Sequence, residues 1–363
     1  MKVLHVITGL DAGGAETQLA ILLRHTRHDA DVVTLYNPGP VAEQIRGDGT
    51  SVRNIGMRGN TDLRALPKLR SLIKAGRYDV VHAHLYRSQI YARPAARLAR
   101  TPVVVTTEHS IGETHIERRK MSAWVRGLYL ASEMFSDATI AVSDVVRDRL
   151  VRWGVPDQKI TVIPNGLDAA ALAFDPAGRK ATRERFGIRQ DAFVIGSLGR
   201  LDENKRVGLT MEAAAPLLRE GNGDCMMFVV GRGDQLEPLK AEAKKAGLAD
   251  RVIFAGFQAD TAAMLSTLDL YVAASEQETF GLAILEAMAC GLPVLYTTCP
   301  ALDGINTAQA RQVPGTVDGL RAALRDAVKA GAGPRLPDSA VFARYGIAAT
   351  AQRVDDLYER LRG

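Results

Sequence analysis

Short apolar runs alternate with longer helical stretches along almost the whole chain. The first series of such runs is "KVLHVIT", "ADVVTLY", "DVVHAHL", "TPVVVTT" and "ATIAVS". A second series starts at "AFVIGSLGRL" and continues through "DCMMFVVG", "RVIFAGF", "LYVAAS" and "LPVLYTT". Strands that are apolar throughout are typical of a parallel sheet covered by helices on both faces. The pattern therefore predicts an α/β chain with two doubly wound, Rossmann-like domains.

The length of 363 residues also suits two domains. The segment at about 169–190 is helix-poor at its start and contains Asp175-Pro176 and Gly178, so we place the linker between the domains there. We accordingly expect an N-terminal domain at 1–170, a second domain at 171–345 and a helical end at 346–363. Ligands of such sheets bind outside the carboxyl ends of the strands, so the main site is expected in the cleft where the two domains face each other.

Composition excludes several classes of protein. The chain is 47% apolar and 24% charged, as soluble globular proteins are. It has no apolar run of about 18 residues, and its start lacks the pattern of a signal peptide. The three cysteines have no metal-binding spacing, so we expect reduced thiols in a cytoplasmic protein. The net charge is +5 without basic blocks interleaved with aromatics, which argues against nucleic-acid binding.

The stretch "EQETFGLAILEAMACGLPV" carries two carboxylates at the carboxyl end of a predicted strand. Helix is expected from about Phe280, so the amides of Phe280, Gly281 and Leu282 would lack partners and attract a ligand. Glu278 reaches the same position from the loop. Glu286 points toward it from the helix, because helical side chains lean toward the N-terminus.

These carboxylates would repel a bare phosphate but can accept hydrogen bonds from paired hydroxyls of a ribose or a hexose. A diphosphate would instead be held by Arg200 and Lys205, in the loop that follows the first strand of the second domain. Taken one at a time, Glu278 could stabilise a helix dipole, Glu286 could face solvent, and the two cations could be ordinary surface residues. Their coincidence at strand ends favours one shared site.

Several motifs of the sequence resemble those of a known protein family. "EQETFGLAILEAMACGLPV" is similar to the E-x7-E signature of glycosyltransferase family 4, whose members are retaining enzymes with the GT-B fold. "GRLDENK" resembles the Arg…Lys pair of that family, "VIPNGLD" its Pro-Asn-Gly motif and "LDAGGAE" its first-domain Gly-Gly loop. "DVVHAH" and "VVTTEHS" match its first-domain strand ends. The similarity extends from residue 1 to about 299.

The resemblance implies roles for individual residues. Glu286 would bind the nucleotide ribose, Glu278 the transferred sugar, and Arg200 with Lys205 the diphosphate, so that neither a metal nor another cofactor is needed. His109 would lie near the sugar as part of the catalytic set. The remaining implied donor-binding residues are Gly14, Gly199, Gly231, Phe280, Gly281 and Leu282, and the implied acceptor-binding residues are Gly13, Glu16 and His84. We assign both glutamates to positioning and electrostatics, not to acid–base catalysis.

The implied function is retaining transfer of a sugar from a nucleotide-diphosphate donor, commonly a UDP-sugar, to a hydroxyl acceptor in polysaccharide, glycolipid or natural-product glycoside synthesis. The first domain would bind the acceptor and the second the donor, and the helix at 346–363 would pack back on the first domain. Two alternatives stay open. One is a nucleotide-sugar epimerase or hydrolase on the same fold, and the other is a two-domain binding protein without catalysis.

Three further motifs have competing interpretations. "DAD" at 29–31 mimics a metal-binding DxD motif but precedes a strand, and His82 with His84 could be a metal pair but has no evident third ligand. We interpret these histidines as lining of the acceptor cleft. The basic run at 118–120 is expected to begin a helix bearing Trp124 and Leu128, which could contact an anionic membrane peripherally. We favour a buried amphipathic helix. The segment 300–320 departs from the family pattern.

Overall fold

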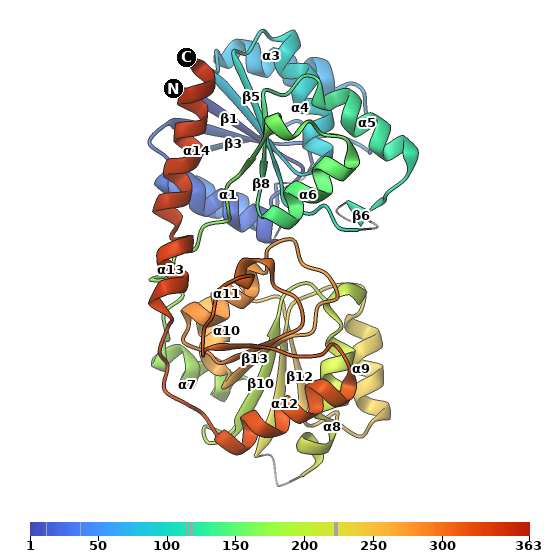
Figure 1. The fold of residues 1–363 in the computed structure, drawn as a ribbon, viewed down its shortest axis with the longest axis vertical. Coiled ribbons are helices and arrows are strands. Elements are labelled where there is room, and N and C mark those ends of the chain that lie inside the picture. The colour runs from blue at the N-terminus through green and yellow to red at the C-terminus, as the bar shows by residue number, and fades with distance from the viewer. Residues whose placement is uncertain (12, 37, 114, 117–118, 221–223) are drawn as a thin grey trace. The chain divides into compact units, whose positions relative to one another are not determined.

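The computed structural model describes residues 1–11, 13–36, 38–113, 115–116, 119–220 and 224–363. The chain forms two compact units (Figure 1), of which unit 1 comprises Met1–Gly166 with Tyr345–Gly363 and unit 2 comprises Leu167–Arg344. Each unit has a parallel sheet with helices on both faces. The predicted α/β class with two Rossmann-like domains is confirmed.

The sheet of unit 1 has the strand order β3-β2-β1-β4-β5-β8-β9, with all neighbours parallel. The order reverses between β1 and β4, and the carboxyl ends of strands at such a reversal form the usual ligand crevice. A separate antiparallel hairpin joins β6 to β7. The strands are β1 (Lys2–Ile7), β2 (Asp29–Thr34), β3 (Ser51–Asn54), β4 (Val80–His84), β5 (Val103–Glu108), β6 (His115–Ile116), β7 (Arg119–Lys120), β8 (Ala138–Ala141) and β9 (Ile160–Val162).

The sheet of unit 2 has the order β12-β11-β10-β13-β14-β15 and is also parallel throughout. Here the order reverses between β10 and β13. The atypical 300–320 segment supplies the edge strand β15. The strands are β10 (Phe193–Leu198), β11 (Cys225–Val230), β12 (Val252–Gly256), β13 (Leu270–Ala273), β14 (Val294–Tyr296) and β15 (Ala310–Gln312).

Helices cover both faces of each sheet. In unit 1 they are α1 (Gly14–His25), α2 (Pro40–Gly47), α3 (Ala65–Gly76), α4 (Tyr86–Leu98), α5 (Ala123–Glu133), α6 (Asp144–Trp153) and α14 (Ile347–Arg362), with the 3-10 turn η1 (Asp157–Lys159). In unit 2 they are α7 (Pro176–Arg185), α8 (Val207–Arg219), α9 (Leu236–Lys245), α10 (Thr261–Thr267), α11 (Leu282–Ala289) and α12 (Val317–Ala330), with the turns η2 (Glu203–Lys205) and η3 (Pro300–Leu302). The short helix α13 (Ser339–Tyr345) spans the return to unit 1.

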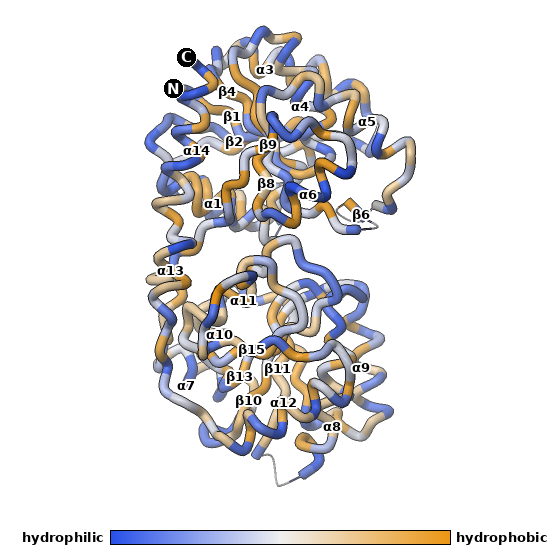
Figure 2. Tube along the Cα trace, viewed as in Figure 1, coloured by the Kyte–Doolittle hydropathy of each residue, from blue (hydrophilic) through white to orange (hydrophobic). Residues whose placement is uncertain are grey.

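The continuous apolar strands have a simple cause. Successive side chains of a strand point to opposite faces, and both faces are covered here. In β1, Leu4 packs into the cluster beneath α3 and α4, whereas Val3 packs into the cluster that contains Leu357 of α14. The hydropathy colouring of Figure 2 shows the hydrophobic strands in the middle of each unit.

Helix α14 is a tightly bonded part of unit 1. Its buried Asp355 accepts hydrogen bonds from Thr26 Oγ1 at 2.7 Å and from the backbone N–H of Arg27 at 3.0 Å. The Tyr358 hydroxyl lies 2.6 Å from Nδ1 of His82 in β4. The two chain termini consequently lie near each other in this unit (Figure 1).

Two predicted segments are wrong in detail. The proposed linker at 169–190 contains α7, whose fully buried Arg183 donates to Asp269 of unit 2 at 2.8 Å, so this helix is part of that unit's core. The helix expected from 118 begins only at Ala123, where the hydroxyl of Ser122 caps it by accepting from Val125 N–H. Residues 119–120 belong to the hairpin strand β7, and 117–118 lie outside the described residues.

Candidate active site

Several of the predicted donor-site residues of unit 2 lie together where its strand order reverses. Loop 199–206 follows β10 and loop 274–281 follows β13, and the carboxyl ends of these neighbouring parallel strands lie side by side. A pocket lies between the two loops. Its lining includes the predicted residues Gly199, Arg200, Lys205, Glu278 and Gly281.

Each predicted phosphate-binding cation is paired with a carboxylate. Lys205 Nζ donates to Glu278 Oε1 at 2.6 Å, and both side chains are largely buried. Arg200 Nε donates to Asp202 Oδ2 at 2.6 Å, while the Arg200 side chain keeps 52% of its surface exposed. Asp202, which also caps η2, is not among the predicted site residues. A diphosphate at this site would compete with carboxylates for both cations.

Glu286 lies on α11 and is not among the residues that line the pocket. It is partly buried, and burial raises the pKa of its carboxyl to about 7, an effect that the nearby positive charge of Lys205 opposes. Tyr271 of β13 lines the same pocket, and its hydroxyl donates to the carbonyl oxygen of Leu198 at 3.1 Å. This tyrosine was not predicted. Its polar hydroxyl within an otherwise apolar strand was the available signal.

The N-terminus of α11 differs from the prediction by two residues. Gly281 is the N-cap, with φ of +99°, and the helix begins at Leu282. A Cβ atom on Gly281 would lie 2.5 Å from Cys299 Sγ, so both backbone conformation and space require glycine. Ile284 N–H already donates to the Gly281 carbonyl at 3.0 Å. In a helix that begins at Leu282, the first-turn amides that point outward are those that come after Gly281 in the sequence. Phe280, where the prediction began them, precedes the helix and is buried.

Asn204 joins the two loops of the site. Its side-chain Nδ2 donates to the carbonyl oxygen of Gln277 at 2.9 Å, and its Oδ1 accepts from the Gln277 N–H at 3.0 Å. Its backbone carbonyl accepts from the N–H of Glu276 at 2.9 Å. Lys205 directly follows Asn204 in the sequence, and Glu278 directly follows Gln277. Nothing in the sequence pattern indicated it.

Gly231 makes a close backbone contact with Gly199. Its φ is +143°, and a Cβ there would lie 1.8 Å from the carbonyl oxygen of Gly199. The N–H of Gly199 in turn donates to the Val230 carbonyl at 2.9 Å. Gly231 therefore allows the ends of β10 and β11 to touch, and it is not among the residues that line the pocket.

The Gly-Gly loop of unit 1 begins α1. Gly13 is the N-cap, Gly14 is the first helical residue, and the Glu16 carboxylate folds back so closely that a Cβ on Gly13 would lie 2.4 Å from its Oε2. A carboxylate at a helix N-terminus stabilises the dipole, as in a capping box. It also places negative charge where an anion would otherwise bind, so this position suits a hydroxyl better than a phosphate.

Four histidines cluster at the carboxyl ends of β1, β4 and β5. His84 Nε2 lies 3.0 Å from His5 Nδ1, and His84 Nδ1 lies 3.3 Å from His109 Nε2. His84 is 2% exposed and both of its ring nitrogens face other histidines, but together with His82 it lines a pocket of unit 1, so its expected contact with an acceptor stays a prediction. His5 is not among the predicted residues, although a histidine inside the apolar run "KVLHVIT" is a signal. His5 is in register with His82.

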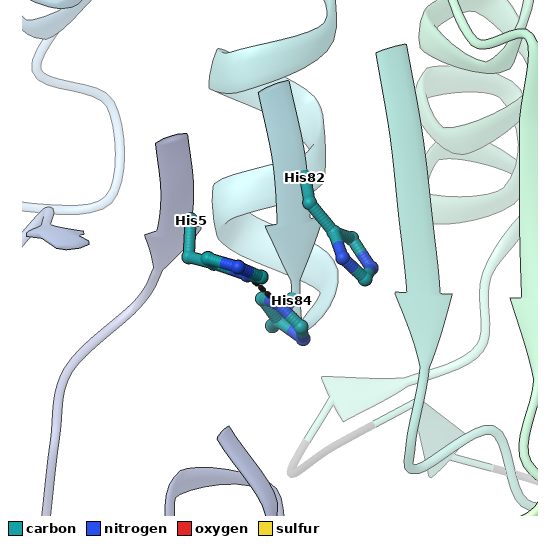
Figure 3. Close-up of side chains that lie close together, drawn as sticks. All are labelled: His5, His82 and His84. Atoms are coloured by element: carbon teal, nitrogen blue, oxygen red, sulfur yellow. Dashed lines mark hydrogen bonds between the residues drawn. The ribbon is translucent and has the colours of Figure 1, made fainter. Parts of the chain in front are cut away.

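Ring nitrogens of His5, His82 and His84 lie within 4.8 Å of one another, so the missing third ligand for a metal is present (Figure 3). However, His82 Nδ1 lies 2.6 Å from the Tyr358 hydroxyl and Nε2 lies 2.7 Å from the Thr107 hydroxyl. An ion would have to displace these bonds as well as the one between His5 and His84. The hydrogen-bonded cluster is therefore the simpler interpretation.

The "DAD" motif lies at the amino ends of the strands, opposite the carboxyl ends where the histidines cluster. Asp29 and Asp31 begin β2, and ligands bind at the other end of such strands. Asp31 Oδ2 accepts from the Tyr78 hydroxyl at 2.5 Å and from Arg53 Nη2 at 3.2 Å. These bonds give Asp31 a structural role.

Two Rossmann-like units with cations, carboxylates and a helix N-terminus at one strand reversal place this chain among GT-B proteins. Comparison with protein families supports that class in both units. The model described as Glycosyltransferase Family 4 matches residues 12–171, and the model described as Glycosyl transferases group 1 matches residues 178–329. Together they span most of the chain, which belongs to glycosyltransferase family 4.

Individual relatives agree with this assignment. The chain is 31% identical over 254 residues to UDP-Gal:alpha-D-GlcNAc-diphosphoundecaprenol alpha-1,3-galactosyltransferase of Escherichia coli, which covers 68% of this chain and 64% of that protein. It is 26% identical to GDP-mannose:cellobiosyl-diphosphopolyprenol alpha-mannosyltransferase of Komagataeibacter xylinus, over 100% of this chain and 94% of the relative.

A solved structure, HepE of Anabaena in complex with UDP-glucose, has the same fold. Its TM-score is 0.84 at 22% identity, with 99% of this chain and 100% of the other covered. Within the described part of this chain, no helix combines the length and the apolarity needed to cross a bilayer.

Proposed function

We propose that this chain is a retaining glycosyltransferase that transfers a sugar from a nucleotide-diphosphate donor, most simply a UDP-sugar, to a hydroxyl acceptor. The observation that carries the proposal is that Arg200, Lys205 and Glu278 line one pocket beside the N-terminus of α11, while Glu286 on the same helix, whose pKa burial raises, lies near enough for the charge of Lys205 to oppose that rise. This arrangement offers positive charge for a diphosphate and carboxylates for sugar hydroxyls in one place.

The proposed reaction follows from those groups. The bond between the anomeric carbon and the diphosphate oxygen breaks, and the acceptor oxygen bonds to that carbon from the same face. The acceptor proton passes to the leaving diphosphate, which accounts for retained configuration. Arg200 and Lys205 stabilise the negative charge that develops on the leaving group. Glu278 is bonded to Lys205 and is assigned to holding a sugar hydroxyl, not to protonating the leaving group.

The donor is supported by analogy with the named relatives. A UDP-galactose enzyme and a GDP-mannose enzyme are both similar to this chain, and the HepE structure contains UDP-glucose. The diphosphopolyprenol acceptors named for the two relatives make a lipid-linked glycan the acceptor that we propose first. Because the two cations of unit 2 supply the charge that a metal would bring, we also propose metal-independent transfer.

Donor binding can be tested by thermal shift with UDP-, GDP- and dTDP-sugars, since a ligand that binds only the folded state raises the melting temperature. We expect one nucleotide class to stabilise the protein and Lys205→Ala to abolish the shift. Lys240→Ala is the matched control, because Lys240 also pairs with a carboxylate, Glu237 at 2.8 Å, but lies on α9. An undiminished shift in Lys205→Ala would remove the diphosphate assignment.

Product analysis separates transfer from the two alternatives. With the stabilising donor and a lipid-linked glycan, a transferase yields the nucleoside diphosphate and an extended acceptor. An epimerase or hydrolase would act on the donor without any acceptor, and a binding protein would leave the donor intact. Either of these last two results would contradict the proposal.

We further propose a peripheral contact between α5 and an anionic membrane. The helix buries Tyr129 but exposes Trp124 by 78% and Leu128 by 37%, one turn apart, and Phe135 just beyond its end is 40% exposed. The exposed Lys120 precedes the helix, and the net charge of the chain is +5. Apolar side chains beside basic ones match a surface of anionic lipid. The expectation that this helix is buried on its apolar side holds for Tyr129 only.

Vesicle flotation tests this contact. The chain should float with vesicles that contain phosphatidylglycerol and less with phosphatidylcholine alone, and Trp124→Glu with Leu128→Glu should abolish flotation. Leu63→Glu is the control, because Leu63 is 76% exposed elsewhere in unit 1. Equal flotation of the double variant and the control variant would rule out α5 as the contact.

A further inference from the structure

Three histidine rings of unit 1 form a hydrogen-bonded series. It runs from His5 on β1 through His84 at the end of β4 to His109, which follows β5. His5 and His84 are each 2% exposed. His109 is partly exposed and follows the carboxyl end of β5, and ligands of such folds bind at the carboxyl ends of the strands. The series therefore connects the interior of unit 1 to a residue of the expected substrate surface.

Burial keeps the rings of the series uncharged at neutral pH. It lowers the pKa of His5 to about 3 and that of His109 to about 4, and it lowers the pKa of His84 well below the usual value. No carboxylate is among the causes of these shifts. A neutral imidazole has one N–H and one lone pair, so each ring can donate through one nitrogen and accept through the other.

The bonds of the series must then all run in one direction. If His5 Nδ1–H donates to His84, then His84 Nδ1–H donates to His109 Nε2, and the hydrogen of His109 is on Nδ1. If His109 Nε2–H donates to His84, then His84 Nε2–H donates to His5, and His109 Nδ1 carries the lone pair. The state of His5 and the state of His109 are thus linked through the middle ring.

His82 packs against this series without joining it. Its ring centroid lies 4.1 Å from that of His84, and Figure 3 shows its ring beside the bonded pair. Its nitrogens face the hydroxyls of Tyr358 and Thr107, which can donate or accept and so impose no direction. The contribution of His82 is to confine the ring of His84.

We propose that His84, supported by His5, is a positioning residue that holds His109 in one ring orientation and one tautomer, and so decides whether His109 Nδ1 offers a hydrogen or a lone pair. The consequence for catalysis rests on the proposed function, because it assumes that His109 contacts a hydroxyl of the sugar or the acceptor. The assignment of the tautomer itself does not depend on turnover.

Nitrogen-15 NMR of the histidine rings in the full chain tests the assignment, since the shifts of Nδ1 and Nε2 separate the two neutral tautomers. In the unchanged protein, His109 should show a single tautomer and no protonation between about pH 6 and pH 8. His5→Phe keeps a ring of similar size but removes the first bond, so His109 should become a mixture of tautomers. His25→Phe is the control, because His25 is exposed at the end of α1.

Activity provides a second readout. Loss of one neutral hydrogen bond should lower kcat/KM for transfer about two- to tenfold in His5→Phe and more in His84→Ala. His84→Asn should recover part of the loss, because its amide can still reach His109 from the position of Nδ1. Binding of the free nucleoside diphosphate, which lacks the sugar and which we assign to unit 2, should not change in any of these variants.

Several results would overturn the proposal. These are a mixture of tautomers at His109 in the unchanged protein, a single unchanged tautomer in His5→Phe, or one equivalent of Zn²⁺ bound by the unchanged protein and lost in His5→Phe. The last result would assign the cluster to a metal ion instead. If the tautomer results hold but no transfer is found, the proposed function fails and the positioning role stands.

Discussion

The carboxyl of Glu286 changes its charge close to neutral pH. Burial raises its pKa from the usual value of about 4.5 to about 7, whereas the unfolded chain would ionise near the usual value. Between these two values the folded state therefore binds more protons than the unfolded state. By linkage, the contribution of Glu286 to stability is present below about pH 4.5 and is lost as the pH rises through about 7.

Donor binding should have the opposite dependence on pH. If the ionised carboxylate accepts hydrogen bonds from ribose hydroxyls, affinity for the nucleotide sugar should rise about tenfold between pH 6 and pH 8. Glu286→Gln should bind more weakly with little dependence on pH. Calorimetry with an intact nucleotide sugar measures this, because its diphosphate, unlike that of a free nucleotide, does not titrate near pH 7. A pH-independent affinity in the unchanged protein would contradict the assignment.

Asn204 offers a test of how the site is held together. Asn204→Ala removes both side-chain hydrogen bonds to Gln277, so the loop that carries Glu278 should lose its fixed position relative to Lys205. We expect the free energy of unfolding to fall by about 1–3 kcal/mol and kcat to fall more than donor affinity. Gln258→Ala is a suitable control, since Gln258 also donates to a backbone carbonyl, at 2.7 Å, but is not among the residues that line the pocket. Equal effects of the two variants would show that Asn204 is only structural.

At this scale the sequence predicts which residues share a site but not how they pair. Lys205 and Glu278 are brought together as expected, because each follows a strand and the two strands are neighbours. The ion pair between them, and the one between Arg200 and Asp202, depend on side-chain geometry that the spacing of residues in the sequence does not determine. The close approach of Gly231 to Gly199 is likewise not encoded by spacing, since it joins the ends of two strands that are distant in sequence.

At the scale of elements, the start of α11 depends on one glycine. Gly281→Ala would impose both a positive φ and a contact of 2.5 Å with Cys299 Sγ. We expect a loss of about 1–3 kcal/mol in the free energy of unfolding and weaker donor binding, because the first turn of the helix must shift. Gly247→Ala is the control, with φ of +69° and open space around it. Cys299→Ala added to Gly281→Ala should recover the part of the loss due to the contact; no recovery would show that φ alone matters.

Helices and strands are predictable here to the extent that their signals are local. The strands follow from apolar runs, and both sheets are found as expected. The hairpin that pairs 115–116 with 119–120 is not predicted, because a basic run followed by apolar residues also fits a helix, and only the capping by Ser122 marks where α5 begins. Local sequence does not identify α7 as part of unit 2, because its anchor, Asp269, lies in another part of the chain.

At the scale of the whole molecule, the chain leaves unit 1 after Gly166 and returns at Tyr345. Both crossings are bonded within unit 1. Gln18 forms two hydrogen bonds with the backbone of Gly166, at 2.8 and 2.9 Å, and a Cβ on Gly166 would lie 2.8 Å from the Cα of Ile347. The Pro-Asn-Gly motif and the start of α14 are therefore packed together, which explains why glycine ends the motif.

Because α14 completes unit 1, weakening its attachment should destabilise that unit and spare the other. Asp355 is 2% exposed, and Asp355→Ala leaves the donors of Thr26 and Arg27 without their acceptor. We expect the free energy of unfolding of unit 1 to fall by about 2 kcal/mol or more. Asp356→Ala is the control, since the side chain of Asp356 is 55% exposed and pairs with Arg27 at the surface, where such pairs contribute little.

Denaturant titration followed by tryptophan fluorescence reports unit 1, because Trp124 and Trp153 both lie in it. Thermal stabilisation by the nucleotide sugar reports on unit 2. Loss of this stabilisation in Asp355→Ala would show that the substitution also destabilises unit 2. In Asp355→Ala the fluorescence transition should move to lower denaturant while the donor still binds. If Asp355→Ala and Asp356→Ala shift that transition equally, the buried hydrogen bonds of Asp355 contribute no more than a surface ion pair, and α14 is held mainly by its apolar face.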